Sequence, residues 1–285
     1  MGTELTIGIP TAGRPEALAR CIASVRASVT VPYRIVVLDS LPTSETAAIC
    51  AGQPDVVHET RPGPIGPSAS RRLIAELDDR EQLLFLDDDI IVQPGAVEML
   101  IARLDASPGT DIVAGGWEEE GSLESRALVQ WFATGETESG PCIVKRFMTV
   151  SEARELGLSV IRADAVLATM VVRRRVWERA SFDPQYGFFY ELFDFFLQCR
   201  EKGIVIEALP GAIFLHDPLP YAAPTQRQMS PRDSDESRFI EKWGYVPLGR
   251  LGMGMAHRAA MTDNDAGGRV NRLRRAAGLE PRTPR

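Results

Sequence analysis

Three consecutive carboxylates, Asp87–Asp89, lie inside the most apolar short stretch of the chain, QLLFLDDDIIV from Gln82 to Val92. Two like charges about 4 Å apart repel by roughly 4 kcal/mol at an effective dielectric constant of 20. The carboxylates can splay into water, raise a pKa or bind a divalent cation. Because apolar residues flank the cluster on both sides, we favour the cation over a solvated loop. Mg²⁺ or Mn²⁺ typically takes one or two carboxylates and completes its coordination with water and substrate phosphate.

Strand geometry predicts which of these acids act together. Side chains alternate along a strand, so we expect Asp87 and Asp89 to converge on one side and Asp88 to point to the other. His216 is a candidate for a further metal ligand, because it follows the strand-like run Ala212–Leu215. Histidine is a common metal ligand, and a purely structural role for His216 is the alternative.

Alternating strands and helices must position these acids. Apolar residues recur with period two in candidate strands and at i, i+3, i+4 and i+7 in candidate helices. The pattern predicts strands at 5–10, 33–40, 55–60, 82–87 and 111–117, with helices within 11–28, 66–79 and 94–107. This order implies βαβ units and a mostly parallel sheet. Ligands bind at the carboxyl ends of such strands, which gathers Thr11, Asp39 and Asp87–Asp89 at one edge.

The second part of the chain is less regular. Glu118–Glu120 is expected to be a solvated loop, and residues from about 140 to 180 are rich in β-strand patterns. A helix follows within FFYELFDFFLQCREKG, then two short strands within 204–218 and a last helix within 233–244. Up to about residue 255 we expect a single domain, with a nucleotide-type front half, 1–117, and a more irregular back half, 118–255.

The remaining residues, 256–285, are expected to form a basic, flexible tail. From Ala266 to Arg285 there are six arginines and one acid, Glu280. A solvated, frayed end and a segment that meets phosphate or an anionic membrane surface both fit this composition.

Composition excludes several classes of protein. A net charge of −7 argues against nucleic-acid binding, because phosphate binding needs a basic surface. No apolar run approaches the roughly 20 residues of a membrane span, and no charged segment followed by an apolar one marks a signal peptide. The four cysteines are scattered without CxxC spacing, which fits a reducing compartment. We therefore expect a cytoplasmic protein, and the sequence leaves its oligomeric state open.

Four segments in order resemble the family-2 glycosyltransferases and their GT-A fold: LTIGIPTAGRPEALARCIASV, IVVLDS, RPGPIGPSASRRLIA and LLFLDDDIIVQPGAVEML. The later run SFDPQYGFFYELFDFFLQCREKG resembles the acceptor-side segment of that family. The match covers roughly Leu5 to His216. It implies an α/β fold with a GT-A type, Rossmann-like, mixed and mostly parallel sheet flanked by helices, and a smaller β-rich acceptor-side half. Residues 1–117 would then be the nucleotide-sugar-binding half, and residues 118–255 the acceptor-binding and catalytic half.

The resemblance also implies roles for individual residues. Those that border the base or bind the nucleotide sugar would be Pro10, Thr11, Arg14, Asp39, Arg71, Asp87 and Asp88. Asp39 would hydrogen-bond the base, typically uracil, and Arg71 would lie near the donor, with Arg72 where the family has Asn. Asp87 and Asp89 would be the DxD pair that holds Mn²⁺ or Mg²⁺, and His216 would be the late metal ligand.

The implied reaction is the metal-dependent transfer of a sugar from a nucleotide-diphosphate donor to a hydroxyl acceptor, with UDP favoured over GDP and dTDP. Small molecules, glycans and lipid-linked molecules all remain open as acceptors. The chain has neither GxGxxG nor GxxxxGK[ST], so no glycine cradle is available for phosphate. A divalent cation would neutralise the leaving diphosphate instead.

Inverting transfer also needs a base that takes the proton of the acceptor hydroxyl, and in the family an acidic pair supplies it. Here Leu192 stands where the second acid would be, and it belongs to the apolar stripe of the predicted helix. Glu191 and Asp194 share the other face, so the base is one of these two. We favour Glu191, which lies nearest the helix start. A role of both acids in helix stabilisation alone is the alternative.

Other interpretations of the sequence compete with this one. LLFLDDDIIV also fits a phosphatase of the haloacid dehalogenase type, with Asp87 as nucleophile. Because Leu192 replaces an acid, a catalytically degenerate sugar-nucleotide-binding protein is a further alternative. Within the transferase hypothesis, residues 230–244 are a candidate lid over the donor. Aromatic residues that could stack on an acceptor are Trp117, Trp131, Phe188, Phe189 and Tyr190.

Overall fold

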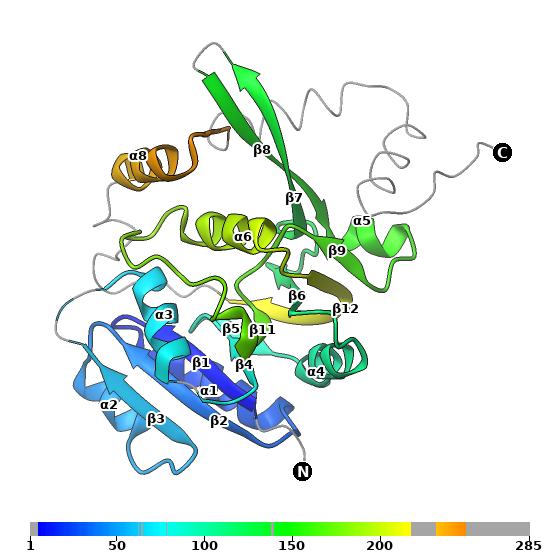
Figure 1. Ribbon diagram of the computed structural model, residues 1–285. Coiled ribbons are helices and arrows are strands. Elements are labelled where there is room, and N and C mark those ends of the chain that lie inside the picture. The colour runs from blue at the N-terminus through cyan, green and yellow to red at the C-terminus, as the bar shows by residue number, and fades with distance from the viewer. Residues whose placement is uncertain are drawn as a thin grey trace.

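The computed structural model describes residues 5–61, 63, 65–77, 79–137, 140–217 and 232–248. The predicted basic tail, 256–285, lies outside the described residues. Figure 1 shows a central sheet flanked by helices, with a long hairpin that extends away from it.

Nine strands of the described part form a mixed sheet in the order β3–β2–β1–β4–β11–β6–β12–β5, and β9 pairs with β12. Their bounds are β1 Leu5–Thr11, β2 Tyr33–Asp39, β3 Val56–Thr60, β4 Gln82–Phe85, β5 Ile90–Val92, β6 Ile112–Glu119, β9 Ile161–Ala163, β11 Met170–Arg173 and β12 Ile206–His216. Strands β3, β2, β1 and β4 run parallel, as the alternating strand and helix patterns predict. The α/β class is confirmed.

The centre of the sheet differs from a simple βαβ series. Strand β11 is inserted between β4 and β6 and runs antiparallel to both. Strand β12 is a single strand parallel to β6, with a register shift between Leu209 and Ile213. The prediction of two short strands in this region was therefore wrong: Pro210–Gly211 interrupts the apolar pattern, but the strand continues past it.

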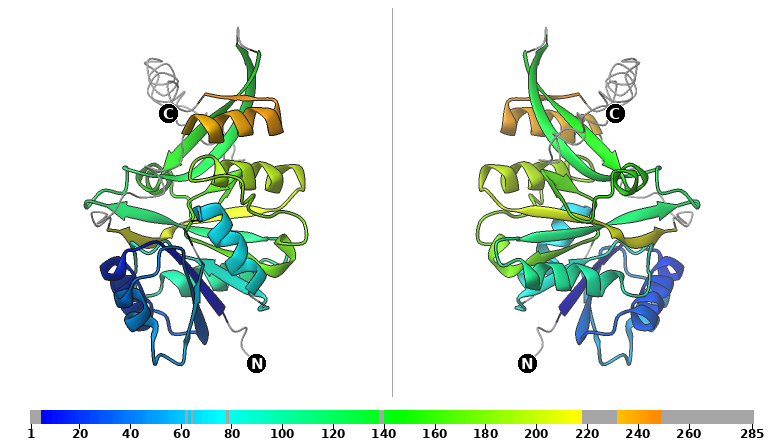
Figure 2. Two further views of the ribbon diagram at one scale, coloured as in Figure 1. Left: turned by 90° about the vertical axis from the view of Figure 1, so that its left-hand side faces the viewer. Right: turned by 90° about the vertical axis from the view of Figure 1, so that its right-hand side faces the viewer.

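Helices cover both faces of the sheet, as the two views of Figure 2 show. They are α1 Pro15–Ser28, α2 Ser44–Cys50, α3 Pro67–Leu77, α4 Ala96–Ala106, α5 Val150–Glu155, α6 Glu191–Glu201 and α8 Arg232–Trp243, with one 3₁₀ turn at Arg174–Val176. In β2, Ile35 and Val37 face the apolar cluster that contains α1 and α4, while Val36 and Leu38 face the cluster that contains α3 and α6. Strand alternation thus builds two separate cores.

A second sheet of order β10–β7–β8–β13 stands beside the first. Strands β7 Ala127–Thr137 and β8 Gly140–Thr149 form the projecting hairpin, and the short strands are β10 Ala165–Val166 and β13 Val246–Pro247. Figure 1 shows α8 next to this hairpin and above α6. The hairpin and α8 therefore make up the side of the molecule that faces away from β1 and β2.

The four cysteines of the chain, Cys21, Cys50, Cys142 and Cys199, are buried and free of disulfide bonds. Within the described ranges, no helix has both the length and the apolar content that crossing a membrane requires.

Candidate active site

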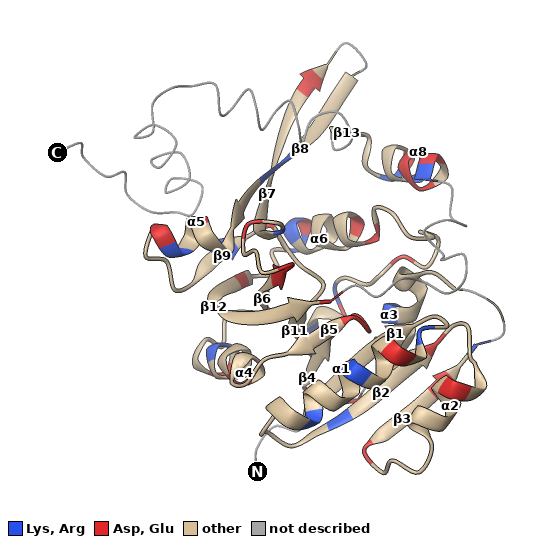
Figure 3. Ribbon diagram, turned by 180° about the vertical axis from the view of Figure 1, so that it is seen from behind, with Lys and Arg blue, Asp and Glu red and all other residues tan. Residues whose placement is uncertain are grey.

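The predicted gathering of polar residues at one sheet edge is confirmed. Thr11 and Asp39 are paired in register at the ends of β1 and β2. Strand β4 ends at Phe85, and Asp87–Asp89 follow it in a turn that leads to β5. The Thr11 hydroxyl donates a hydrogen bond to Asp88 Oδ2 at 2.7 Å. In Figure 3 acidic residues lie beside β5, close to the basic residues of α3.

The expectation that Asp88 would point away from Asp89 was wrong. Because the backbone turns after β4, with Ile90 N–H bonded to Asp87 O at 3.1 Å, strand alternation does not extend to the three acids. Asp88 and Asp89 share the guanidinium of Arg14. Arg14 Nη1 lies 2.6 Å from Asp88 Oδ1, and both of its terminal nitrogens lie 3.1 Å from Asp89 Oδ2.

Arg14 is buried with the two acids that it joins. It is the N-cap residue of α1, whose first turn carries Pro15. Burial raises the pKa of Asp88 to about 7, although Arg14 acts in the opposite direction. Burial would also raise the pKa of Asp89, but His216 and Arg14 outweigh it and hold that pKa below its usual value. The pair is therefore stabilised by a guanidinium, a counter-ion that the sequence interpretation had assigned to the nucleotide base.

A second guanidinium connects the cluster to α6. Arg71, on α3, lies 2.7 Å from Asp87 Oδ1 and 3.5 Å from Glu191 Oε1. Arg71 is 3% exposed, whereas the Asp87 side chain is 29% exposed and is the most open of the three acids. The exposed Arg72 pairs with Glu76 on its own helix. Arg71 thus links Asp87, after β4, to Glu191 at the start of α6.

His216 lies at the other end of the cluster. Its Nε2 is 3.7 Å from Asp89 Oδ2, and its Nδ1 is 2.7 Å from Glu119 Oε1. Burial lowers the pKa of His216, but the two carboxylates outweigh that effect and raise it overall. Arg126 holds Glu119 through two hydrogen bonds of 2.7 Å. Trp117 stacks on the imidazole, with ring centroids 4.6 Å apart.

Glu119 was missed by the sequence interpretation, which placed it in a solvated loop. That expectation was wrong because β6 continues through Glu119, where it pairs in register with His216. Only the parallel pairing of β6 with β12 brings Glu119 next to His216. No local sequence pattern predicts that pairing. Asp217 helps to hold the same region, since its backbone N–H donates to Asp89 O at 2.9 Å and its side chain pairs with Arg20.

Asp39 and Pro10 lie at the same sheet edge with different accessibility. Asp39 is fully buried, and its carboxylate accepts hydrogen bonds from Thr46 Oγ1 at 2.6 Å and Leu41 N at 3.1 Å. His58 Nε2, on the neighbouring strand β3, lies 3.5 Å from Asp39 Oδ2. Pro10 is partly exposed.

Glu191 is the first residue of α6 and is 9% exposed. Burial raises its pKa to about 7, while Arg71 and Lys145 favour the ionised form and Asp87 disfavours it. Lys145, on β8, places its ammonium 3.8 Å from the centre of the Phe193 ring. A carboxyl with a pKa near 7 is suited to accept a proton at physiological pH. No sequence pattern indicates that Lys145 lies near Glu191, because β8 is far from α6 in the chain.

Asp194 has a different environment. It is fully buried, and it accepts hydrogen bonds from Trp243 Nε1 at 2.8 Å, Gln198 Nε2 at 2.7 Å and Lys242 Nζ at 3.0 Å. These contacts join α6 to α8. They are the contacts of a carboxylate that stabilises the fold, and they leave Glu191 as the acid of α6 that faces Arg71 and Asp87.

The aromatic residues proposed for acceptor stacking divide between core and surface. Tyr190 packs on Phe239 of α8, and the Trp131 indole N–H donates to Arg162 O at 3.0 Å. Phe188 and Phe189 are half-buried beside each other, with centroids 5.3 Å apart. The described part of the proposed lid, 232–244, forms α8 and packs on the loop before α6 and on α6 itself.

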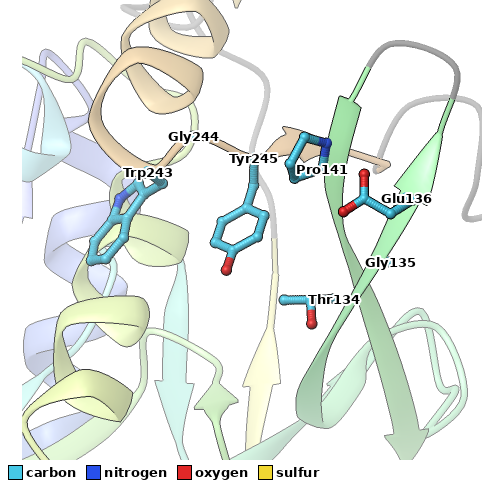
Figure 4. A pocket seen from close by; sticks show the side chains of 7 residues that line it. All are labelled: Thr134, Gly135, Glu136, Pro141, Trp243, Gly244 and Tyr245. Atoms are coloured by element: carbon cyan, nitrogen blue, oxygen red, sulfur yellow. The ribbon is translucent and has the colours of Figure 1, made fainter.

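A groove of about 450 Å³ lies between the hairpin and the end of α8. Trp243 and Tyr245 form one wall, and Pro141 and Glu136 form the other (Figure 4). None of the candidate site residues lines this groove. It is therefore separate from the cluster around Asp87–Asp89.

Comparison with known proteins gives the family. The family described as Glycosyl transferase family 2 matches residues 6–178, which contain the aspartate cluster, Arg14 and Arg71. The chain belongs to glycosyl transferase family 2. No curated protein matches it.

Solved structures of S. aureus TarS are similar to this chain in fold, the GT-A fold. TarS 1–349 superposes with a TM-score of 0.56 at 13% sequence identity, over 75% of this chain and 60% of that chain. A second TarS structure gives the same TM-score and identity over 75% of this chain and 37% of its own length. The chain thus spans less than two thirds of the length of either structure. The match to this family argues against the alternative of a haloacid dehalogenase-type phosphatase with Asp87 as nucleophile.

Proposed function

We propose that this family-2 glycosyltransferase moves a sugar from a nucleotide-diphosphate donor, with UDP favoured, to a hydroxyl acceptor with inversion, and that Glu191 is the base. One observation carries the proposal: the Arg71 guanidinium lies 2.7 Å from Asp87 and 3.5 Å from Glu191. The buried Arg71 side chain therefore connects the aspartate cluster, where the donor would bind, to the Glu191 carboxyl. Burial raises the pKa of that carboxyl to about 7.

Asp89 and His216 fit the requirements of a divalent cation, Mn²⁺ or Mg²⁺. Their facing atoms are 3.7 Å apart, and Glu119 holds the other ring nitrogen of His216, as carboxylates commonly do beside metal-binding histidines. Among the described residues, no group of three or more His, Cys, Asp and Glu side chains is arranged to hold a metal. Two protein ligands suit a cation that takes its remaining oxygens from a diphosphate and water.

The chemistry follows from these positions. When bound, the cation would neutralise the negative charge of the leaving diphosphate. Glu191 would take the proton of the acceptor hydroxyl while the acceptor oxygen bonds to the anomeric carbon and the bond to the diphosphate breaks. Asp87, whose second carboxylate oxygen accepts no hydrogen bond within the described residues, would bind the ribose or the cation of the donor.

The first test is calorimetry of UDP with and without Mn²⁺. Mn²⁺ is expected to tighten UDP binding by about tenfold or more, which corresponds to about 1.4 kcal/mol. Asp89→Ala should lose this gain, because it removes a ligand of the cation. Asp79→Ala is the matched control, since the Asp79 side chain is 82% exposed and pairs only at the surface with Arg34. If the affinity for UDP is the same with and without Mn²⁺, and the same in Asp89→Ala as in wild type, the metal-dependent proposal is refuted.

The pH dependence of turnover tests the base. The free enzyme needs Glu191 ionised, so the rate of UDP release from a UDP-sugar at low substrate concentration should rise tenfold per pH unit up to about pH 7 and then level off. Lys145→Met should move this midpoint to higher pH, because the Lys145 ammonium lowers the pKa of Glu191. Lys202→Met, at the far end of α6, should not move it. An unchanged midpoint in Lys145→Met would argue for another base.

The degenerate sugar-nucleotide-binding protein remains the second candidate, because Leu192 packs on the core where an acid would stand in the family pattern. It predicts UDP binding without any release of UDP from UDP-sugars. The same release assay therefore separates the two functions.

A further inference from the structure

The loop that precedes Glu191 is held by a single buried carboxylate. Asp235, on α8, accepts hydrogen bonds from three consecutive backbone N–H groups, those of Gly187 at 3.0 Å, Phe188 at 3.0 Å and Phe189 at 2.8 Å. Asp235 is 3% exposed. Three N–H donors converging on one buried carboxylate form a strong, charge-assisted set of hydrogen bonds.

The neighbours of Asp235 on α8 contact the same loop. Arg232 lies over the rings of Phe189 and Tyr190, with distances of 5.0 and 5.8 Å, and Glu236 accepts a hydrogen bond from the Tyr190 hydroxyl at 2.5 Å. Residues 232, 235 and 236 are spaced i, i+3 and i+4, so they share one face of the helix. One face of α8 therefore contacts the four residues immediately before Glu191.

The same face of α8 continues onto α6. Phe239 is fully buried and packs on Phe193, with ring centroids 4.6 Å apart. One turn further, Lys242 and Trp243 bond to Asp194. Helix α8 therefore fixes the first turn of α6 as well as the loop before it. Figure 3 shows acidic and basic residues together on this helix.

The loop needs such support because its backbone is strained and closely packed. Tyr190, the N-cap of α6, has φ of 64°, a left-handed conformation that costs a non-glycine residue roughly 1–2 kcal/mol. On the side opposite α8, a Cβ at Gly66 would lie 1.9 Å from Gly187 O, so the start of α3 touches the loop backbone directly. Ser68 also donates to Asp183 O at 2.7 Å. The loop is thus clamped between α3, which carries Arg71, and α8.

We infer that Asp235 is a positioning residue for the reaction: it holds the 187–190 loop so that Glu191 meets Arg71 and Asp87 in the orientation that proton transfer requires. This inference rests on the proposed function, because it assigns Asp235 a role through the base. The charged groups that face Glu191 are Arg71 on α3, Asp87 after β4 and Lys145 on β8. A loosened loop would move Glu191 away from these partners and into water.

The test compares Asp235→Asn with the wild-type chain. The asparagine keeps the shape of the side chain, but it removes the charge and places an NH₂ group among three N–H donors. Amide hydrogen exchange of residues 187–189 should rise at least about tenfold, and donor hydrolysis should fall about 10–100-fold. The affinity for UDP should stay unchanged. The acid limb of the rate profile should move to lower pH, because a hydrated Glu191 has a lower pKa.

Two further variants keep the test decisive if Asp235→Asn folds poorly. Tyr190→Phe keeps the ring and removes only the hydroxyl, with its hydrogen bonds to Glu236 and Arg232, so it should cause a smaller change in the same direction. Glu241→Gln changes an exposed acid on the outer face of α8 and should behave as wild type in every assay. A structural role alone would lower the folded fraction without moving the midpoint of the pH profile.

The outcomes separate this inference from the proposed function. If wild type releases UDP from a UDP-sugar and Asp235→Asn matches its rate and pH midpoint, the inference fails and the proposed function stands. Wild-type exchange rates at 187–189 in the variant would also overturn it. If wild type releases no nucleoside diphosphate from UDP-, GDP- or dTDP-sugars, the proposed function fails and the inference falls with it.

Discussion

Replacing Glu191 by glutamine is expected to lower the rate of UDP release by about 10²–10⁴-fold, the range typical for loss of a general base. The affinity for UDP should remain close to that of wild type, because Glu191 reaches the aspartate cluster only through Arg71. Glutamine has the same shape and can still accept a hydrogen bond from that guanidinium. Steady-state release from a UDP-sugar and UDP calorimetry provide the two measurements.

The stability of Glu191→Gln should change in the opposite direction to its activity. The pKa of Glu191 is raised from 4.5 to about 7 in the fold, so the ionised carboxyl costs stability above pH 7. Removing it should increase the free energy of unfolding at pH 8, by on the order of 1–3 kcal/mol. The gain should fade as the pH falls from 7 towards 4.5, where the wild-type carboxyl is protonated in both states. Thermal denaturation at pH 8 and pH 5 measures this difference.

Asp194→Asn is the matched comparison on the same helix. It removes the charge that Lys242 and Trp243 bond to, so it should lower the free energy of unfolding by about 1–3 kcal/mol. Any fall in turnover should follow the loss of folded protein. Full activity in Glu191→Gln together with a specific loss in Asp194→Asn would reverse the assignment of the base.

Local patterns were sufficient to predict which residues meet at the sheet edge of the candidate site. Period-two strands predicted that Thr11, Asp39 and the aspartates would meet at one sheet edge, and they do. The helix that begins at Glu191 also follows from its apolar periodicity. These features depend on residues close in sequence, which is why the amino-acid pattern alone determines them.

Side-chain partners within the site could not be predicted in the same way. The alternation argument failed for Asp87–Asp89 because it holds only for extended backbone, and the chain turns at Asp88 and Asp89. Arg14 and Arg71 pair with these acids from α1 and α3, and no local sequence pattern indicates which arginine approaches which acid.

Distant strands and helices supplied the remaining residues. Glu119 meets His216 because β6 and β12 pair over a separation of 97 residues. Asp235 reaches the 187–190 loop from a helix that begins more than 40 residues later. Such contacts depend on how the elements are arranged in space, and propensity and periodicity carry no information on that arrangement.

Arg14→Met is expected to cause the largest loss of stability, about 3–5 kcal/mol near neutral pH. Methionine retains the apolar stem but removes the guanidinium that Asp88 and Asp89 share at 2.6 and 3.1 Å. Both carboxylates would then be buried beside each other without this cation. Arg26→Met, which breaks the exposed pair with Asp55, is the control and should cost no more than about 1 kcal/mol.

The pH dependence of that loss identifies its cause. Burial already raises the folded-state pKa of Asp88 to about 7, and Arg14 limits the increase. A carboxyl with a raised pKa costs stability where it is ionised in the fold, and the cost disappears as the pH falls below that pKa towards the unfolded value. Without Arg14 the pKa rises further, so the deficit relative to wild type should be larger at pH 8 than at pH 5. Urea denaturation at both values measures it. A deficit equal to that of Arg26→Met, or one independent of pH, would mean that the guanidinium does not neutralise the cluster, and the charge of Asp87–Asp89 would again need a cation from solution.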